Sequence, residues 1–158
     1  MYKKIMVPLD GSELAECVLP HVEAIATACK AASVVFVRVL HPIHLQANVP
    51  ANGILGFNEK KLKQMEEQRR QAADDYLKKI VESCRINEAA LSCEVLKGSV
   101  ATTLSQWAEN NRVDLIVIAS HGRSGISRWV YGNVADRVLR SACTPILMIR
   151  APGCKSGI

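Results

Sequence analysis

The chain has 158 residues, of which 49% are hydrophobic, 22% are charged and 4% are aromatic, and its formal net charge is +5. This length fits a single domain, and this composition excludes a disordered, collagen-like or coiled-coil chain. No apolar run approaches the ~20 residues of a membrane-spanning helix, and Met1 leads into a strand-like run rather than a signal peptide. We therefore expect a cytoplasmic protein without a membrane partner.

Strand-like and helix-like segments alternate along the chain. Continuous apolar runs predict buried strands, whereas apolar residues three and four positions apart predict helices. The expected order is a strand at 3–9, a helix at 12–31 with Ser12 as its cap, a strand at 33–40, a loop at 41–57, a helix at 58–85 capped by Asn58, a strand at 90–97, a helix at 99–110 capped by Ser99, a strand at 113–118, a loop at 119–127, a helix marked by Val130, Val134 and Val138, and a strand at 145–150.

This order predicts an α/β fold, with one doubly wound, five-stranded parallel sheet and helices on both faces. The helix at 58–85 carries an expected apolar seam, and its many charges favour a solvated face. The residues of the seam are Leu62, Met65, Ala72, Tyr76, Ile80 and Cys84. In such sheets, ligands bind beyond the carboxyl ends of the strands, near the point where the strand order switches. Asp10, Val39 and the 119–127 loop follow strands and are therefore the first places to examine.

The positive charge lies in the last quarter of the chain. Residues 1–118 contain 14 basic and 14 acidic side chains, whereas residues 119–158 contain six basic side chains and Asp136 alone. With so few aromatic side chains for base stacking, this distribution favours a small anionic ligand over a nucleic acid. Solvated helix faces are the alternative explanation. The six cysteines form no C-x-x-C pair, so neither a metal site nor a disulfide framework is expected.

The segment Ala-Ser-His-Gly-Arg-Ser-Gly at 119–125, followed by Gly132-Asn133, is the sharpest local motif. Glycines at a strand end let backbone N–H groups approach a phosphate, and the amino terminus of the next helix favours negative charge. The motif is neither a Walker loop nor a G-x-G-x-x-G fingerprint. An ordinary turn with a packing glycine is the alternative to phosphate binding.

The chain resembles the universal stress protein family. The resemblance covers residues 2–150 and rests on the opening KKIMVPLDGS, the segment VDLIVIASHGRSG, the close GNVADRVLRSACTPILMIR and the order of the elements. It implies a Rossmann-like fold related to adenine nucleotide hydrolases, a domain at 1–150 and a frayed tail at 151–158. It also implies a homodimer that binds ATP, with or without Mg. The last strand would lie at the sheet edge and pair with its copy through Ile146, Leu147, Met148 and Ile149.

The resemblance also implies which residues bind the nucleotide. The nucleoside would contact Pro8, Leu9, Asp10, Val39, Ile118 and Ala119, and the phosphates would contact Gly122, Arg123, Gly132, Asn133 and Val134. Two positions depart from the family motif. Ala119 stands in place of its first glycine, and Asn133 stands in place of a serine or threonine, although an Asn amide can also donate to a phosphate.

Three functions follow as alternatives. The first is an ATP-bound dimer that regulates a stress response, with slow or no hydrolysis and no catalytic residues of its own. The second is a weak ATP hydrolase, and the third is a nucleotide-free dimer that acts as an interaction scaffold. The sequence names neither the stress signal nor the downstream protein partner.

Overall fold

The computed structural model describes residues 1–43, 55–120 and 134–150. Strands and helices alternate in it as the sequence predicts. The elements are β1 (Lys4–Pro8), α1 (Glu13–Glu16), α2 (Leu19–Cys29), β2 (Ser33–Leu40), α3 (Leu55–Ser83), β3 (Ala90–Lys97), α4 (Val100–Asn110), β4 (Leu115–Ala119), α5 (Val134–Ser141) and β5 (Ile146–Ile149). The predicted α/β fold is therefore confirmed.

The five strands form one parallel sheet in the order β3-β2-β1-β4-β5. The chain runs from β1 outward to β3, then crosses back to place β4 on the other side of β1. The strand order therefore switches between β1 and β4. In open parallel sheets of this kind, the crevice beyond the carboxyl ends at the switch is the usual place for a ligand.

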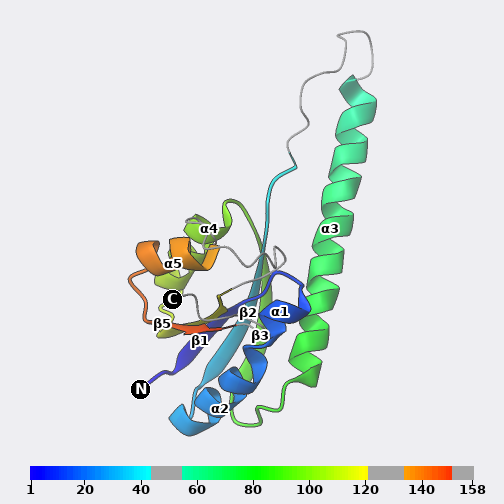
Figure 1. Ribbon diagram of the computed structural model, residues 1–158. Helices are drawn as coiled ribbons and strands as arrows, with labels where there is room; N and C mark the ends of the chain where they lie inside the picture. The colour runs from blue at the N-terminus through cyan, green and yellow to red at the C-terminus, as the bar shows by residue number, and fades with distance from the viewer. Residues whose placement is uncertain (44–54, 121–133, 151–158) are drawn as a thin grey trace.

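Each face of the sheet has its own buried core. On one face, Val7 and Phe36 pack with side chains of α1, α2 and α3. On the other face, Met6 and Val35 pack with side chains of α4 and α5. Figure 1 shows α4 and α5 together on one side of the sheet and α3 on the other. Because both faces are covered, the central strands are continuously apolar rather than alternating.

The helix predicted at 12–31 is two helices in the structure. Pro20 lies in the first turn of α2 and has no N–H to donate to the carbonyl of Glu16, so one continuous helix cannot form. The cap prediction for Ser12 is confirmed, because Ala15 N donates to Ser12 Oγ at 3.2 Å. Ser99 holds the cap position of α4 but makes no side-chain cap hydrogen bond there.

The long helix differs from its prediction at both its start and its seam. It begins at Leu55, so the predicted loop at 41–57 ends earlier and Asn58 lies inside the helix rather than at its cap. Residues 44–54 of that loop lie outside the described residues. One glycine costs a helix only about 1 kcal/mol, so Gly56 does not prevent the early start. The buried residues of the seam are Ala73, Leu77 and Ile80, whereas Met65 is 45% exposed and Ala72 is also exposed.

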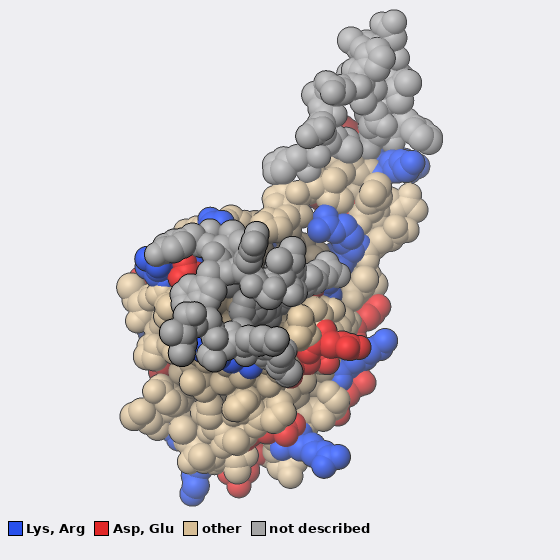
Figure 2. Space-filling model, in the orientation of Figure 1, with Lys and Arg blue, Asp and Glu red and all other residues tan. Residues whose placement is uncertain are grey.

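The charged face of α3 is as predicted. Figure 2 shows positive and negative side chains interspersed along the side of the molecule that α3 forms. On this helix, Lys78 Nζ and Asp74 Oδ2 form an ion pair at 2.6 Å. Among the described residues, no helix is long and apolar enough to cross a membrane.

Candidate functional site at the strand-order switch

Strand register brings the predicted nucleoside residues to one edge of the sheet. Pro8 lies opposite Val37, and Leu9 N donates to Val37 O at 2.9 Å, so the chain beyond β1 runs beside Val39. On the other side, Met6 pairs with Ile116, which places Ile118 level with Pro8 two residues further on. Six residues of separate sequence segments thus meet at the carboxyl ends of three adjacent strands. They are Pro8, Leu9, Asp10, Val39, Ile118 and Ala119.

These six residues do not all face the same way. Val39 and Ile118 pack with the core under α4 and α5, whereas Leu9 and Ala119 pack with the core under α1, α2 and α3. Only the first pair can offer side chains to a ligand on the α4 side of the sheet. Leu9 and Ala119 are 3% and 8% exposed, so they could contribute there only through their backbone.

The turn after β1 fixes the carboxylate of Asp10. Ser12 donates to Asp10 Oδ1 twice, from its backbone N at 2.9 Å and from its Oγ at 2.6 Å. Gly11 between them has a φ of +86°, a backbone conformation that other residues rarely adopt. The same Ser12 hydroxyl caps α1, so the turn and the first helix support each other. Asp10 is half-buried and held in one orientation at the strand end.

Arg38 is a site residue that the sequence reasoning missed. It lies one position before Val39 and extends to the opposite face of the sheet, where its guanidinium carbon is 5.2 Å from the centre of the Tyr76 ring. Both terminal nitrogens of Arg38 would lie 2.8 Å from a β-carbon at Gly11. Arg38 is the single charged residue within the apolar run SVVFVRVL. That isolated charge in a central strand was the signal available in the sequence.

Tyr76 links this cluster to two helices. Its hydroxyl donates to Glu16 Oε1 of α1 at 3.0 Å, while its own backbone belongs to α3. Burial raises the pKa of Tyr76 far above the ordinary range, the hydrogen bond to Glu16 raises it further, and the positive charge of Arg38 opposes both. The negative charge of Asp10 also raises this pKa. Tyr76 therefore remains a neutral hydrogen-bond donor.

The second half of the predicted site begins where β4 ends. Ser120 N donates to Ile149 O at 2.8 Å, which ties the end of β4 to β5. Gly122, Arg123, Gly132 and Asn133 lie outside the described residues. Val134 is the first residue of α5 and is 41% exposed, so it does not contribute to the buried face of the helix as its spacing with Val138 had predicted.

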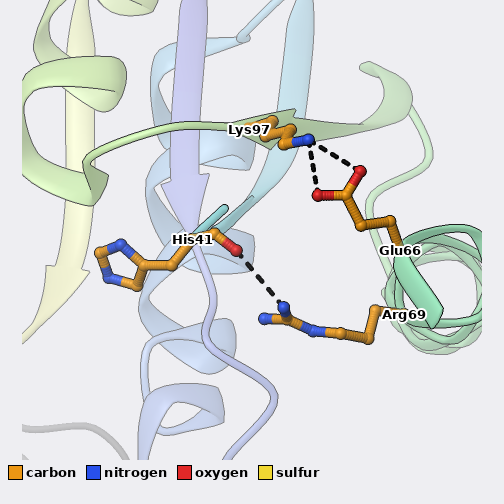
Figure 3. Close-up of polar contacts among 4 residues, drawn as sticks. All are labelled: His41, Glu66, Arg69 and Lys97. Carbon is orange, nitrogen blue, oxygen red and sulfur yellow. Dashed lines mark hydrogen bonds and ion pairs between the residues drawn. The ribbon is translucent and has the colours of Figure 1, made fainter. Parts of the chain in front are cut away.

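A separate groove of about 390 Å³ lies between α3 and the ends of β2 and β3. Lys97 Nζ of β3 donates to both carboxylate oxygens of Glu66, at 2.8 and 2.9 Å, and Arg69 Nη1 donates to the backbone oxygen of His41 at 3.4 Å (Figure 3). The hydrogen bond from Lys97 lowers the pKa of Glu66. These contacts join the exposed part of α3 to the edge of the sheet.

The described residues contain no group of three or more His, Cys, Asp or Glu side chains that could hold a metal ion. Their cysteines are free thiols. Burial raises the pKa of Cys84 to about 11, with a further contribution from Glu23, and burial also raises the pKa of Cys17 and Cys93. These three thiols are therefore poor nucleophiles at neutral pH. Cys154 lies outside the described residues.

β5 forms one edge of the sheet, as expected for the last strand. All four of its residues, Ile146, Leu147, Met148 and Ile149, are apolar and half-buried. A largely apolar groove of about 470 Å³ lies beside the strand. Tyr2, Ile25, Cys29, Ile146 and Leu147 are among its lining residues.

Known proteins resemble this chain over nearly its whole length. The model of the universal stress protein family matches residues 1–150. Universal stress protein MJ0531 of Methanocaldococcus jannaschii is 29% identical over 152 residues, which are 96% of this chain and 84% of that protein. The solved structure of MJ0577, from the same organism, has a TM-score of 0.79 at 24% identity and covers 99% of both chains.

A further solved structure is that of a universal stress protein family protein from Arabidopsis thaliana with AMP bound. It has a TM-score of 0.60 at 14% identity, over 98% of this chain and 95% of that one. At these identities, the two structural matches establish the fold. Because the family model spans every strand of the sheet and every helix of both layers, the chain belongs to the universal stress protein family.

Proposed function

We propose that this chain is an ATP-binding regulatory module that acts as a homodimer in the cytoplasm during a stress response, with slow or no hydrolysis. The observation that carries the proposal is the meeting of the Asp10 turn and the end of β4 at the strand-order switch. In this type of sheet that crevice is where nucleotides bind. The Arabidopsis relative, whose structure contains AMP, supports an adenine nucleotide as the ligand.

The nucleoside end of the site would be formed by the first two strands. Asp10 is held rigidly by Ser12 and can accept a hydrogen bond from the nucleoside through its carboxylate. Val39 would meet adenine through its backbone, next to the apolar side chain of Ile118. Pro8, Leu9 and Ala119 would complete the walls. A fixed carboxylate beside an apolar surface suits a base and ribose better than it suits a phosphate, which it would repel.

The phosphate end would be formed by the segment between β4 and α5. Gly122 and Gly132 would let backbone N–H groups approach the phosphates, and Arg123 would supply positive charge. Asn133 would donate from its amide just before Val134, where α5 begins and its unpaired N–H groups favour an anion. Mg would accompany the triphosphate rather than occupy a cage of protein ligands.

A regulatory role rather than an enzymatic one is supported by the chemistry of the site. Asp10 Oδ1 accepts two hydrogen bonds from Ser12, and this holds the carboxylate in place rather than freeing it to take a proton from water. A weak ATP hydrolase remains the second candidate. The third is a nucleotide-free scaffold, which the apolar edge at β5 would serve equally well.

The homodimer is proposed through β5. An exposed edge strand with four apolar residues offers unpaired backbone groups and hydrophobic surface together. Two copies meeting edge to edge would form a two-fold interface. The apolar groove beside Ile146 and Leu147 would be covered in the same contact.

One experiment separates the three candidates. The protein is purified without added nucleotide and denatured, and the released small molecules are identified by mass spectrometry. Calorimetric titration with ATP then compares the wild type with Asp10→Ala. We expect released adenine nucleotide, micromolar or tighter binding by the wild type, and at least tenfold weaker binding by the variant, since one hydrogen bond to a charged group contributes about 1.5–3 kcal/mol.

Each alternative has its own signature in that experiment. Phosphate release at a steady rate that Asp10→Ala abolishes would favour the hydrolase. No co-purified nucleotide and no heat on titration would favour the scaffold and contradict the proposal. Asp10→Asn serves as the matched variant, because it keeps the size of the side chain and an acceptor oxygen for Ser12 while removing the charge.

A further inference from the structure

The guanidinium of Arg38, a planar cation, lies on the side of the Asp10 turn that faces away from Val39. Arg38 and Val39 are neighbours in β2, and successive strand residues point to opposite faces. Val39 packs with the α4 side, so Arg38 lies on the α3 side, where it contacts Tyr76. The two residues therefore support the same strand end from opposite faces of the sheet.

The contact between Arg38 and the turn is close. A β-carbon at Gly11 would lie 2.8 Å from Nη1 and Nη2 of Arg38 and 2.9 Å from Cζ. Real side-chain carbons do not approach so closely, so the guanidinium rests directly on the glycine backbone. Gly11 also has a φ of +86°. The positive φ is what favours glycine here, and a side chain at this position would also displace the guanidinium of Arg38.

The guanidinium of Arg38 also contacts the ring of Tyr76. Its carbon lies 5.2 Å from the centre of the Tyr76 ring, within the range of a cation–π contact. Tyr76 is fixed in turn by its hydrogen bond to Glu16 Oε1 at 3.0 Å. Glu16 belongs to α1, the helix that the Asp10 turn leads into. The contacts therefore run from Gly11 to Arg38, Tyr76 and Glu16, and return through α1 to Ser12.

We propose that Arg38 is the positioning residue of the nucleoside site: its guanidinium, pressed between Gly11 and Tyr76, holds the Asp10–Ser12 turn in the conformation that presents the Asp10 carboxylate. This inference rests on the proposed nucleotide-binding function. Arg38 acts through Asp10 and does not touch the nucleoside, because it lies on the other face of the sheet. Its planar shape matters as well as its charge, since only a flat group can fit between a backbone and a ring.

A double-mutant cycle tests whether Arg38 acts through Asp10. Adenosine affinity is measured by calorimetry for the wild type, Arg38→Met, Asp10→Ala and the double variant. We expect Arg38→Met to weaken binding about tenfold in the wild-type background and hardly at all in the Asp10→Ala background. Fully additive losses would mean that Arg38 does not work through the carboxylate and would overturn the proposal.

Two further variants test whether the planar shape of Arg38 or only its positive charge is needed. Arg38→Lys keeps the positive charge but cannot lie flat on Gly11 and Tyr76, so we expect it to bind adenosine nearly as weakly as Arg38→Met. Arg85→Met removes one positive charge from an exposed position just after α3, and it should bind as the wild type does. Wild-type affinity in Arg38→Lys would show that charge alone is required and would contradict the positioning role.

The turn can also be examined without nucleotide. Ser12 N donates to Asp10 Oδ1, so its hydrogen exchange, measured by NMR, reports whether the turn is formed. We expect exchange at Ser12 to become about tenfold faster in Arg38→Met while the amides of β1 and β4 keep their protection. Gly11→Ala should have the same effect on Ser12, if the variant folds.

This measurement distinguishes failure of the inference from failure of the proposed function. If the wild type binds no adenosine or ATP, the proposed function is wrong, and faster Ser12 exchange in Arg38→Met would still support the hold of Arg38 on the turn. If Ser12 exchange is unchanged in Arg38→Met, the inference is wrong whether or not nucleotide binds.

Discussion

The two halves of the sheet, divided at the switch between β1 and β4, are built by different means. In the half that contains β1, β2 and β3, polar side chains fix the backbone, as in the Asp10 turn and the contacts of Arg38 and Tyr76. In the half that contains β4 and β5, apolar packing and the backbone ladder dominate the described contacts of the strands, and Asp114, just before β4, accepts hydrogen bonds from Lys3 N and Lys4 N. One half supplies a rigid polar turn, and the other ends in an apolar edge.

The two edge strands show the same difference. β3 alternates exposed residues such as Ser92 and Glu94 with half-buried apolar ones, and α3 packs along it. β5 has no charged residue and no fully buried or fully exposed one. Charges on an edge strand discourage pairing with another chain, whereas an apolar edge invites it. The comparison favours β5 over β3 as the edge that forms the proposed dimer.

The largest expected effect comes from making β5 resemble β3. Ile146→Lys with Leu147→Lys places two charges at the proposed dimer interface, where like charges of the two copies would meet. We expect a dimeric wild type and a variant that is monomeric at high micromolar concentration, as measured by light scattering. Far-UV circular dichroism must show that the variant is folded, since both side chains also pack on the core.

A second variant tests the same interface by removing a backbone donor, without adding any charge. The carbonyls of Pro145 and Ile149 accept hydrogen bonds from β4. Successive residues of a strand direct their backbone N–H and C=O groups to opposite sides, so the N–H of Met148, the residue before Ile149, faces the open edge. Met148→Pro would remove that donor and leave the ladder with β4 intact, and it should also give monomers. Ser92→Lys on β3 is the matched control and should leave the dimer unchanged. A monomeric wild type would contradict the proposed interface.

The second effect concerns the proposed phosphate end, which follows β4 in the other half of the sheet. Gly132→Asp would add bulk and a negative charge where the phosphates are proposed to bind. Loss of one or two charge-assisted hydrogen bonds, each about 1.5–3 kcal/mol, means about tenfold to a thousandfold or more weaker ATP binding. A carboxylate near a helix amino terminus is itself tolerated, so the variant should fold. Calorimetric titration with ATP measures the loss.

Asn133→Ser is the matched change in the opposite direction. It restores the hydroxyl that the family motif carries at this position, and we expect it to bind ATP at least as tightly as the wild type does. Unchanged ATP affinity in a folded Gly132→Asp protein would show that the phosphates bind elsewhere.

The third expected effect is on the ionisation of Tyr76 at high pH, in the half of the sheet that contains β1, β2 and β3. Because burial and Glu16 raise the pKa of Tyr76 above its unfolded value, the hydroxyl contributes stability that is complete below pH ~10 and is lost as pH rises through the folded pKa. The absorbance difference at 295 nm between the wild type and Tyr76→Phe should therefore show no phenolate until well above pH 10. Ionisation of Tyr76 in the ordinary range would mean that its contact with Glu16 is open in solution.

The smallest effect is expected at the groove beside α3. Glu66→Gln or Lys97→Met breaks an ion pair whose side chains are 32% and 59% exposed, and exposed pairs contribute little. The lowered pKa of Glu66 means that the pair stabilises the protein above the ordinary carboxyl pKa and is lost as pH falls through the folded pKa. Urea unfolding should show a slight loss at pH 7 that disappears in high salt and at acid pH. A large loss would show a buried role for this pair.

Most of the fold could be predicted because β1, β2, β4 and β5 are largely apolar runs, as a sheet covered on both faces requires, and β3 alternates between exposed and half-buried residues. The strands at 33–40 and 90–97 are predicted to the residue. The errors fall where a single residue opposes the pattern. Pro20 divides the helix predicted at 12–31, although the apolar spacing continues through this residue. Gly56, which is predicted to lie in a loop, lies inside α3.

The site was predicted less completely for a different reason. Asp10 follows β1 and Val39 lies near the end of β2, so the topology alone brings them to the switch. The isolated charge of Arg38 is visible in the sequence, but its contacts are not, because Gly11 and Tyr76 are 65 residues apart in sequence. Contacts between distant segments are decided by packing and register, which local pattern does not contain.

Helix α3 is longer than the sheet that supports it, and this has a mechanical consequence. Its 29 residues extend ~43 Å, whereas the eight residues of β2 or β3 extend ~26 Å. Among its described residues none before Ala73 is buried, and in Figure 1 its first turns project well past the strands. The packing of α3 on the core thus begins at Ala73, and before that point Glu66 and Arg69 make polar contacts with Lys97 and His41. We expect α3 to lose its hydrogen bonds turn by turn from Leu55 toward Ala73, at free energies far below global unfolding, while the packed part of the helix holds Tyr76 beneath the proposed nucleoside site.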